Sequence, residues 1–288
     1  MIGSHGGLDD MTLLNRLFRS ESPKFEHPIK TTVGRVMQKS GRFEHLRVQR
    51  VGYELPFFSA SNFSLTYWVE PGLVDPTEEF VRTVLRPGDV FVDVGANVGT
   101  VSALAAGVVG PNGRVVAIEP HPTTFSLLRR TLAANGRQNV TCLNVACGST
   151  AGMATLTDEP RKDDNNKVDE SGAGIPVKVT ALIDLLRDHS LAKVDLLKID
   201  VEGFEYAVLS GLEGDLSMIG AMHIEVIEAN LGRYGHSTAA IVSLLQRNGF
   251  ACFEIIDDPT NLVAFSTAPQ VSGWGVGLVG LPGNPVLD

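Results

Sequence analysis

From residue 89 onward, short apolar runs alternate with longer segments in which apolar residues recur at helical spacing. Runs of this length predict buried strands, and the segments of about 10–15 residues between them predict helices. The predicted strands are DVFVDVG (89–95), RVVAIEP (114–120), VTCLNVAC (140–147), VDLLKID (194–200), AMHIEVI (221–227), FACFEI (250–255) and NLVAFS (261–266). This alternation indicates an α/β fold, with a doubly wound, mainly parallel sheet covered by helices on both faces.

The chain before this region has a different pattern. FEHLRVQRVGYEL (43–55) and FSLTYWVE (63–70) are rich in β-branched and aromatic residues and predict a few antiparallel strands. A short helix is expected at 12–18, and another helix is expected after Asp75, which is followed by proline at the first helical position. We therefore expect a partly β N-terminal extension over 1–74.

Two further boundaries follow from composition. The α/β domain is expected over 75–267, and residues 268–288 form a Gly/Pro-rich tail. The polar segment 158–174 has too few apolar residues to join a core and is expected to be an exposed loop. This loop and the N-terminal extension are the expected walls of an acceptor pocket.

Overall composition bounds the class of protein. The 288 residues are 43% hydrophobic and 20% charged, which is typical of a globular chain with a sizeable core. The formal net charge of −9 argues against nonspecific binding to nucleic acid. No apolar run reaches the roughly 20 residues needed to span a bilayer, and the N-terminus lacks the pattern of a signal peptide. The three cysteines do not suggest a disulfide framework, so a cytoplasmic location is expected.

A glycine-rich turn follows the first strand of the α/β region, within the stretch DVGANVGT (93–100). Such a turn presents backbone N–H groups and a helix N-terminus to a ligand. The dinucleotide pattern G-x-G-x-x-G fails, because Asn97 and Thr100 replace two of its glycines. A ligand with an amine and a carboxylate suits the turn better, since Asp93 can accept from the amine while the amides face the carboxylate.

Glu119 ends the second strand, at the place where an acid can accept hydrogen bonds from both hydroxyls of a ribose. Residues around Asn144–Cys147, at the end of the third strand, would then contact an adenine. The alternative is a buried turn with a capping Asp93 and a solvated Glu119. The candidate cofactor-binding residues are Asp93, Gly95, Ala96, Asn97, Gly99, Thr100, Glu119, Pro120, Asn144, Ala146 and Asp200.

An amino-acid moiety, a ribose and an adenine together describe S-adenosylmethionine. The stretches DVFVDVGANVGT, AIEP and VDLLKIDVEGFEYAVLSG resemble the motifs of the FkbM-type methyltransferases, which are Rossmann-like class I enzymes. The resemblance covers about residues 75–255. It implies a seven-stranded doubly wound domain and methyl transfer from S-adenosylmethionine, usually to a hydroxyl oxygen. It also implies a secondary metabolite, sugar or glycolipid as acceptor.

Three acids are expected to surround one volume beside the methyl group: Asp200, Glu202 and Glu225. One interpretation makes an acid the general base, with a pKa raised by its like-charged neighbours. In the other, Asp200 and Glu225 hold a divalent cation such as Mg²⁺ that binds the acceptor oxygen. The sequence leaves both open.

Four nearby residues are interpreted as structural. Glu205 fits the first turn of a helix, Lys198 fits an ion pair with Asp200, and His223 fits a core position. His121 is expected to line or cap the region near the adenine.

Two alternative functions also remain open: a nucleotide-dependent oxidoreductase and a noncatalytic module that binds S-adenosylmethionine. A homodimer through the N-terminal segment or the tail is open as well.

Overall fold

A computed structural model describes residues 27–158, 167–168, 174–212, 214–255, 258–266 and 278–280, with only the backbone for 258–260 and 278–280. The predicted helix at 12–18 lies outside the described residues, as do most of the 158–174 loop and nearly all of the tail. Among the described residues, no helix combines the length and the apolar character that crossing a membrane requires.

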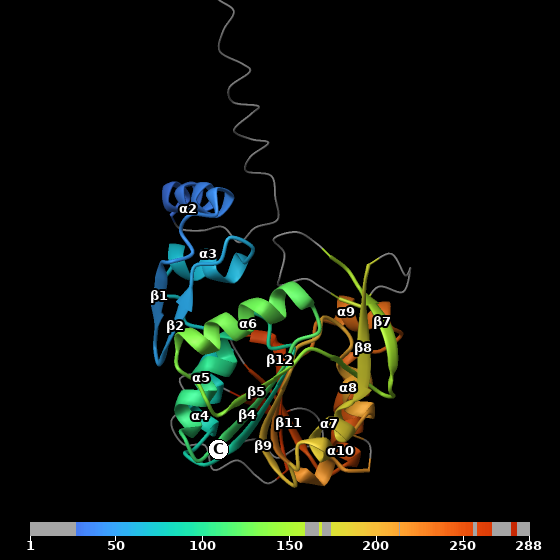
Figure 1. Ribbon diagram of the computed structural model, residues 1–288. Helices are drawn as coiled ribbons and strands as arrows, with labels where there is room; N and C mark the ends of the chain where they lie inside the picture. Colours follow the sequence, from blue (N-terminus) through green and yellow to red (C-terminus); the bar gives the residue numbers. More distant parts are fainter. Residues whose placement is uncertain are drawn as a thin grey trace, which may run out of the picture.

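One large sheet organises the molecule (Figure 1). Its strand order is β13-β11-β12-β10-β9-β3-β4-β5. Five neighbouring strands run parallel to one another: β5 (Val140–Leu143), β4 (Arg114–Ile118), β3 (Val90–Val94), β9 (Val194–Ile199) and β10 (Ile219–Glu225). β12 (Asp258–Phe265) is antiparallel to both of its neighbours in the sheet, β10 and β11 (Ala251–Ile255). The predicted seven-stranded, mainly parallel sheet is thus confirmed, and β13 (Leu278–Gly280) adds a short edge strand.

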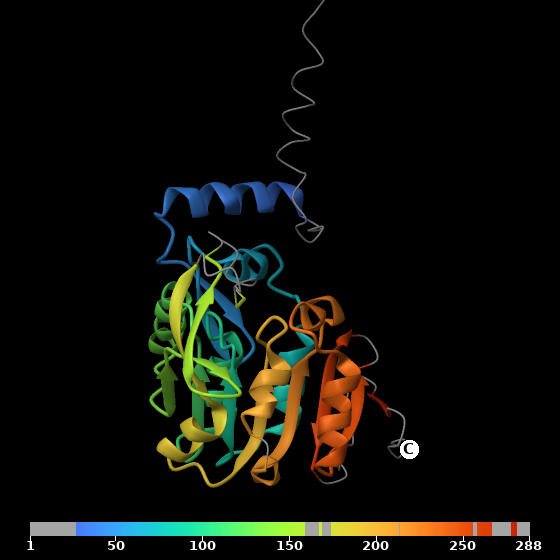
Figure 2. The ribbon, with the colours of Figure 1, turned by 90° about the vertical axis from the view of Figure 1, so that its right-hand side faces the viewer.

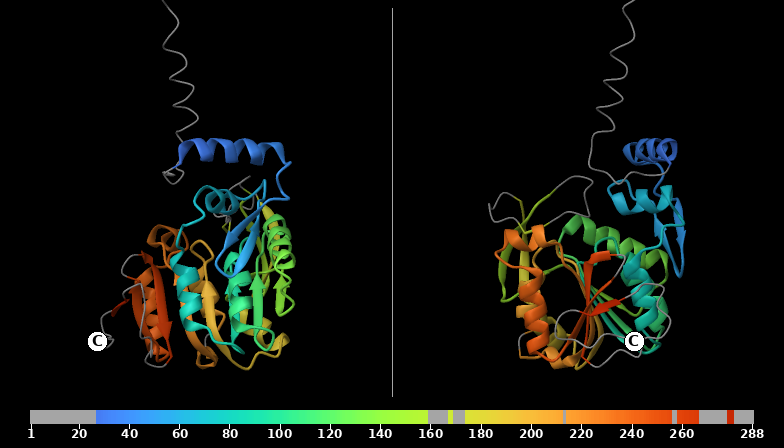
Figure 3. Two further views of the ribbon diagram at one scale, coloured as in Figure 1. Left: turned by 90° about the vertical axis from the view of Figure 1, so that its left-hand side faces the viewer. Right: turned by 180° about the vertical axis from the view of Figure 1, so that it is seen from behind.

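Helices cover both faces of this sheet and bury two separate cores (Figures 1 and 3). One face carries α4 (Pro76–Val84), α5 (Thr100–Val109) and α6 (Pro122–Ala134). The other carries α7 (Leu182–Asp188), α8 (Glu205–Ser210), α9 (Glu228–Arg233) and α10 (Thr238–Arg247). The predicted start of α4 is confirmed, because the Asp75 carboxylate accepts the backbone N–H groups of Thr77 and Glu78.

The N-terminal extension contains α2 (Pro28–Ser40), a hairpin of β1 (Arg47–Arg50) and β2 (Tyr53–Pro56), and α3 (Asn62–Val69). In Figure 2, α2 lies across the top of the molecule, farthest from the large sheet. The predicted strand at 63–70 is wrong, since these residues form α3. The Ser61 hydroxyl caps this helix by accepting the Ser64 N–H, and Leu65 and Val69 pack with Met37 of α2.

A second correction concerns the predicted strand 140–147. β5 ends at Leu143, and β6 (Ala146–Gly148) belongs to a three-stranded sheet in the order β6-β8-β7. The chain turns at Asn144, whose side-chain amide donates to the carbonyl oxygens of Glu119 and Pro120. β7 (Gly152–Leu156) and β8 (Ile175–Ala181), which flank the polar segment 158–174, were not predicted.

Candidate functional site

Polar side chains lie near the carboxyl edge of the parallel sheet, in two rows that each run across neighbouring strands. In the first row, Asp93 of β3 pairs in register with Lys198 of β9, which pairs with His223 of β10. All three side chains are buried. Side chains alternate between the faces of a strand, so the residues two positions further along point to the same face. These are Gly95, Asp200 and Glu225, and Glu119 lies beside them at the end of β4.

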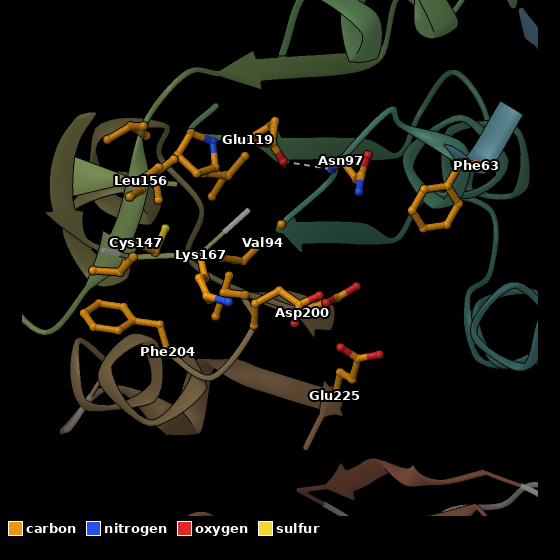
Figure 4. Close-up of a pocket in the computed structure, with 18 residues that line it drawn as sticks. Phe63, Val94, Asn97, Glu119, Cys147, Leu156, Lys167, Asp200, Phe204 and Glu225 are labelled. Carbon is orange, nitrogen blue, oxygen red and sulfur yellow. Dashed lines mark hydrogen bonds between the residues drawn. The ribbon is translucent and has the colours of Figure 1, made fainter. Parts of the chain in front are cut away.

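A cavity of about 220 Å³ opens at this edge, between the large sheet and the three-stranded sheet (Figure 4). It lies at the switch point of the strand order, where open α/β sheets place their ligands. Eight of the candidate residues from the sequence line it: Gly95, Asn97, Glu119, Pro120, Ala146, Asp200, Glu202 and Glu225. Five others are not among the residues that line it: Asp93, Ala96, Gly99, Thr100 and Asn144.

The glycine loop is shaped by close packing as well as by access to the cavity. Gly95 has φ of 79°, and a Cβ built on it would lie 1.8 Å from the carbonyl oxygen of Asp200. Gly99 has φ of 85°, and its Cβ would lie 2.5 Å from Leu128 of α6. The glycines were predicted to make room for a ligand. The structure shows that they also let the loop pass against β9 and α6.

Asp93 is fully buried, and its contacts are made inside the protein. The Ser102 hydroxyl of α5 donates to Asp93 Oδ2 at 2.6 Å, and Lys198 Nζ lies 3.4 Å from Oδ1. The predicted contact of Asp93 with a ligand amine therefore stays a prediction. In this geometry the Asp93 carboxylate faces Lys198, and neither residue lines the cavity.

Glu119 is held by the backbone on both sides. The N–H of Asn97 donates to one carboxylate oxygen at 3.0 Å, and the N–H of His121 donates to the other at 2.9 Å. Burial raises the pKa of Glu119 to about 7, although these two N–H groups favour the ionised form. Each oxygen still has a lone pair that can accept from a ligand hydroxyl.

Asp200, Glu202 and Glu225 form a cluster at the other side of the cavity, where one oxygen of each lies within 4.8 Å of the others. Burial alone would raise the pKa of Asp200, but the Lys198 ammonium 3.0 Å away outweighs it and holds that pKa below its usual range. The charge of Asp200, together with burial, raises the pKa of Glu225 well above its usual range. The two carboxyls thus share a proton, in the manner of paired acids.

This cluster fits a divalent cation poorly. Asp200 Oδ2 accepts from the Lys198 ammonium, and Glu202 Oε2 accepts from the side-chain amide of Asn230 at 2.7 Å. A cation at this cluster would also lie close to the Lys198 ammonium, which would repel it. Of the two interpretations that the sequence left open, the geometry favours proton transfer.

Three of the four residues interpreted as structural are held as expected. Lys198 forms the predicted ion pair with Asp200, and Glu205 accepts the backbone N–H groups of Val201 and Gly203 at the start of α8. His223 packs on the ring of Phe80, with 5.2 Å between ring centroids. His121 caps the N-terminus of α6 and is not among the residues that line the cavity.

Several lining residues were not named individually by the sequence analysis. Cys147, Leu156 and Phe204 form an apolar end of the cavity, beside Lys167 (Figure 4), and Val145 also lines the cavity. Phe63 of α3 lies at the opposite end, beyond Asn97. Val145 and Cys147 lie in the segment Asn144–Cys147, which was expected to contact an adenine, and Phe204 belongs to the stretch VDLLKIDVEGFEYAVLSG. Phe63 and Lys167 belong to the extension and to the 158–174 loop, which were expected to form walls of an acceptor pocket. Leu156 comes from a segment to which the sequence assigned no part in the site.

The sequence profile described as the Methyltransferase FkbM domain matches residues 93–252, which is 160 of the 288 residues. The chain is also similar to the 31-O-demethyl-FK506 methyltransferase FkbM of Streptomyces tacrolimicus. The identity is 32% over 199 residues, covering 58% of this chain and 74% of that protein.

Two further relatives match over shorter parts of their length. Methyltransferase sdnD of Sordaria araneosa is 32% identical over 161 residues, which is 44% of this chain and 62% of that protein. The hexuronic acid methyltransferase AglP of Haloferax volcanii is 27% identical over 155 residues, covering 52% and 62%. The chain thus spans less than two thirds of the length of each of these two relatives.

Among solved structures, the methyltransferase FkbM from Methylobacillus flagellatus aligns with 70% of this chain and 52% of its own, at 19% identity and a TM-score of 0.41. At this TM-score the likeness says nothing about the site.

Proposed function

The chain belongs to the family of FkbM-type methyltransferases, and from this premise we propose that it transfers a methyl group from S-adenosylmethionine to a hydroxyl oxygen of a small or glycosylated acceptor. The observation that carries the proposal is one cavity that joins the glycine loop and Glu119 to the proton-sharing pair Asp200–Glu225. The glycine loop and Glu119 suit a nucleoside that carries an amino-acid group, and the Asp200–Glu225 pair suits removal of a proton.

In the proposed complex, the two ends of the cavity hold different parts of the donor. The apolar end, with Cys147 and Phe204, takes the adenine. Glu119 accepts from the ribose hydroxyls, because its carboxylate is fixed by two backbone N–H groups. The acids at the strand ends then lie beside the sulfonium, whose positive charge they attract.

The chemistry requires one bond to form as another breaks. When bound, S-adenosylmethionine supplies a methyl carbon that bonds to the acceptor oxygen as its bond to sulfur breaks and that electron pair returns to sulfur. The chain's own residues hold the acceptor in line and receive the hydroxyl proton, which passes to Asp200. General bases contribute roughly 10²–10⁴-fold to a rate, and the lowered pKa of Asp200 places its contribution at the lower end of this range, so positioning of the acceptor supplies much of the effect.

The acceptor is proposed to lie between the acids and Phe63, which would make the extension over 1–74 a cap on the acceptor side. The names of two relatives support a hydroxyl-bearing small molecule or sugar. One acts on 31-O-demethyl-FK506 and the other on hexuronic acid.

A transfer assay with isotopically labelled donor tests this proposal. The wild-type protein and Asp200→Asn would be incubated with sugars, glycolipids and polyketide alcohols, and the labelled products isolated. We expect label in an ether of at least one acceptor class, at a rate about 10²-fold lower for Asp200→Asn. Binding of NAD(H) without any binding of S-adenosylhomocysteine would instead support the oxidoreductase alternative. Donor binding without transfer to any acceptor would support the noncatalytic one.

A further inference from the structure

Lys198 is a buried cation that lies beside the proposed base, Asp200. Its side chain is 7% exposed, and its neighbours along β9, Leu197 and Ile199, are fully buried. Removing an ammonium from water costs several kcal/mol, and an apolar residue of similar size often gives equal or greater stability at such a site. The position therefore calls for a reason beyond stability.

The contacts of Lys198 join three elements beside the cavity. Its Nζ donates to Asp200 Oδ2 at 3.0 Å and to the carbonyl oxygen of Gly95 at 3.2 Å, and it lies 3.4 Å from Asp93 Oδ1. Asp93 is itself fixed by the Ser102 hydroxyl of α5. A continuous series of polar contacts thus runs from α5 through β3 and β9 to the edge of the cavity.

We infer that Lys198 is a positioning residue for methyl transfer, which fixes the Asp200 carboxylate in the orientation that receives the acceptor proton. This inference rests on the proposed function. The Asp200 side chain is 34% exposed and lies just past the end of β9, so Lys198 restrains a group that otherwise faces open space.

The donor loop does not depend on Lys198 to the same degree. The backbone N–H groups of Gly95 and Ala96 both donate to the carbonyl oxygen of Ile118 at 3.0 Å, which holds the loop against β4. Removal of the Lys198 ammonium is therefore expected to affect turnover much more than donor affinity.

Lys198 is not itself a base. Burial alone would lower its pKa, but Asp200, Asp93 and Glu225 raise it above its usual range, so the amine keeps its proton. The other titratable groups around the Lys198–Asp200 pair come from four elements: Glu119 after β4, Glu202 in the turn after β9, Glu205 of α8 and His223 of β10.

A double-mutant cycle tests the inference. Lys198→Met, Asp200→Asn and the double variant would be compared for kcat with an acceptor of the wild-type protein and for the dissociation constant of S-adenosylmethionine. Lys193→Met is the matched control, because Lys193 also pairs with an aspartate two residues on, Asp195, at the exposed opposite end of the same strand.

We expect kcat to fall about 10²-fold in Lys198→Met, with donor affinity within tenfold of the wild-type protein and Lys193→Met unchanged. The double variant should be no slower than Asp200→Asn, because a residue that acts through Asp200 has nothing left to position. Losses that multiply in the double variant, or wild-type turnover in Lys198→Met, would overturn the inference.

Lys198→Met leaves Asp93 with a buried charge, so folding is checked by thermal unfolding. If this variant does not fold, the same cycle is run in an Asp93→Asn background, where that charge is gone, and the same outcomes decide. Absence of transfer by the wild-type protein would overturn the proposed function itself. An active wild-type protein with multiplicative losses would overturn only the role of Lys198.

Discussion

At the scale of the residue, three acids around one cavity differ because their neighbours differ. Asp200 has the Lys198 ammonium beside it and stays ionised. Glu225 faces the charge of Asp200 and keeps its proton, while Glu119 lies between two backbone N–H groups. The surroundings of each carboxyl, and not its residue type, therefore determine whether it is ionised and what it can do in the site.

This arrangement predicts that the donor and its product respond differently to pH. As the pH rises through the raised pKa of Glu225, the Asp200–Glu225 pair gains a second negative charge. That charge attracts the cationic sulfonium of the donor but not the neutral sulfur of S-adenosylhomocysteine. Affinity for the donor, relative to the product, should therefore increase from neutral to alkaline pH, as measured by titration calorimetry of both ligands.

Glu225→Gln is the control for this prediction. Glutamine retains the shape of the side chain and cannot ionise, so the ratio of the two affinities should become nearly independent of pH. Ionisation of Glu119 affects both ligands alike and cancels in the ratio. An unchanged pH dependence in Glu225→Gln would contradict the assignment of the shared proton.

The side chains that meet at the site were only partly predictable. The meeting of Asp200 and Glu225 was predictable, because each lies near the carboxyl end of a predicted strand and parallel strands end at the same edge of a sheet. The burial of Asp93 depends on Ser102 and Lys198, which no local pattern reveals. Leu156 and Lys167 reach the cavity through tertiary packing of distant segments.

At the scale of the element, the loop between β3 and α5 depends on the absence of a side chain at one point. Gly95→Ala would place a Cβ against the Asp200 carbonyl oxygen at a positive φ, so the loop would have to move. We expect this variant to lose donor binding by at least about 10²-fold, since loop and strand end would separate.

Gly88→Ala is a matched control at the other end of β3. Gly88 also has a positive φ, of 94°, but a Cβ there would meet nothing within 4 Å. Both variants should lose about 1–2 kcal/mol of stability from the backbone strain. Calorimetry should find normal donor binding in Gly88→Ala only; equal binding by the two variants would refute the close approach as the cause.

The elements themselves were predictable where their pattern was long and periodic. In the large sheet, apolar strands alternate along the chain with helices, because helices bury both faces of the sheet. Residues 63–70 misled because β-branched and aromatic residues were interpreted as a strand, whereas packing against α2 and the Ser61 cap produce a helix. The break between β5 and β6 depends on hydrogen bonds of Asn144 to a neighbouring strand end, which sequence spacing does not encode.

At the scale of the whole molecule, the N-terminal extension and the α/β region share one core. Tyr53, Leu55 and Phe58 belong to the same buried cluster as residues of α5 and α6. The extension also supplies Phe63 to the cavity. The boundary at residue 74 therefore separates two sequence patterns that pack together.

Phe63 provides a test of the proposed acceptor side. Phe63→Ala removes an aromatic wall at the end of the cavity away from the adenine, so it should raise the KM for the acceptor several-fold and leave the dissociation constant of the donor unchanged. Phe43→Ala, which alters an aromatic residue of the extension that packs near Phe57 and Leu65, is the control. A weaker donor with an unchanged acceptor KM would place Phe63 on the donor side.

A crystal structure with S-adenosylhomocysteine tests the central claim most directly. The account predicts that the ribose hydroxyls lie within hydrogen-bonding distance of Glu119, with the adenine against Phe204 and the sulfur on the side of Asp200 and Glu225. A ligand bound outside this cavity, or bound with its sulfur turned away from those two acids, would contradict it.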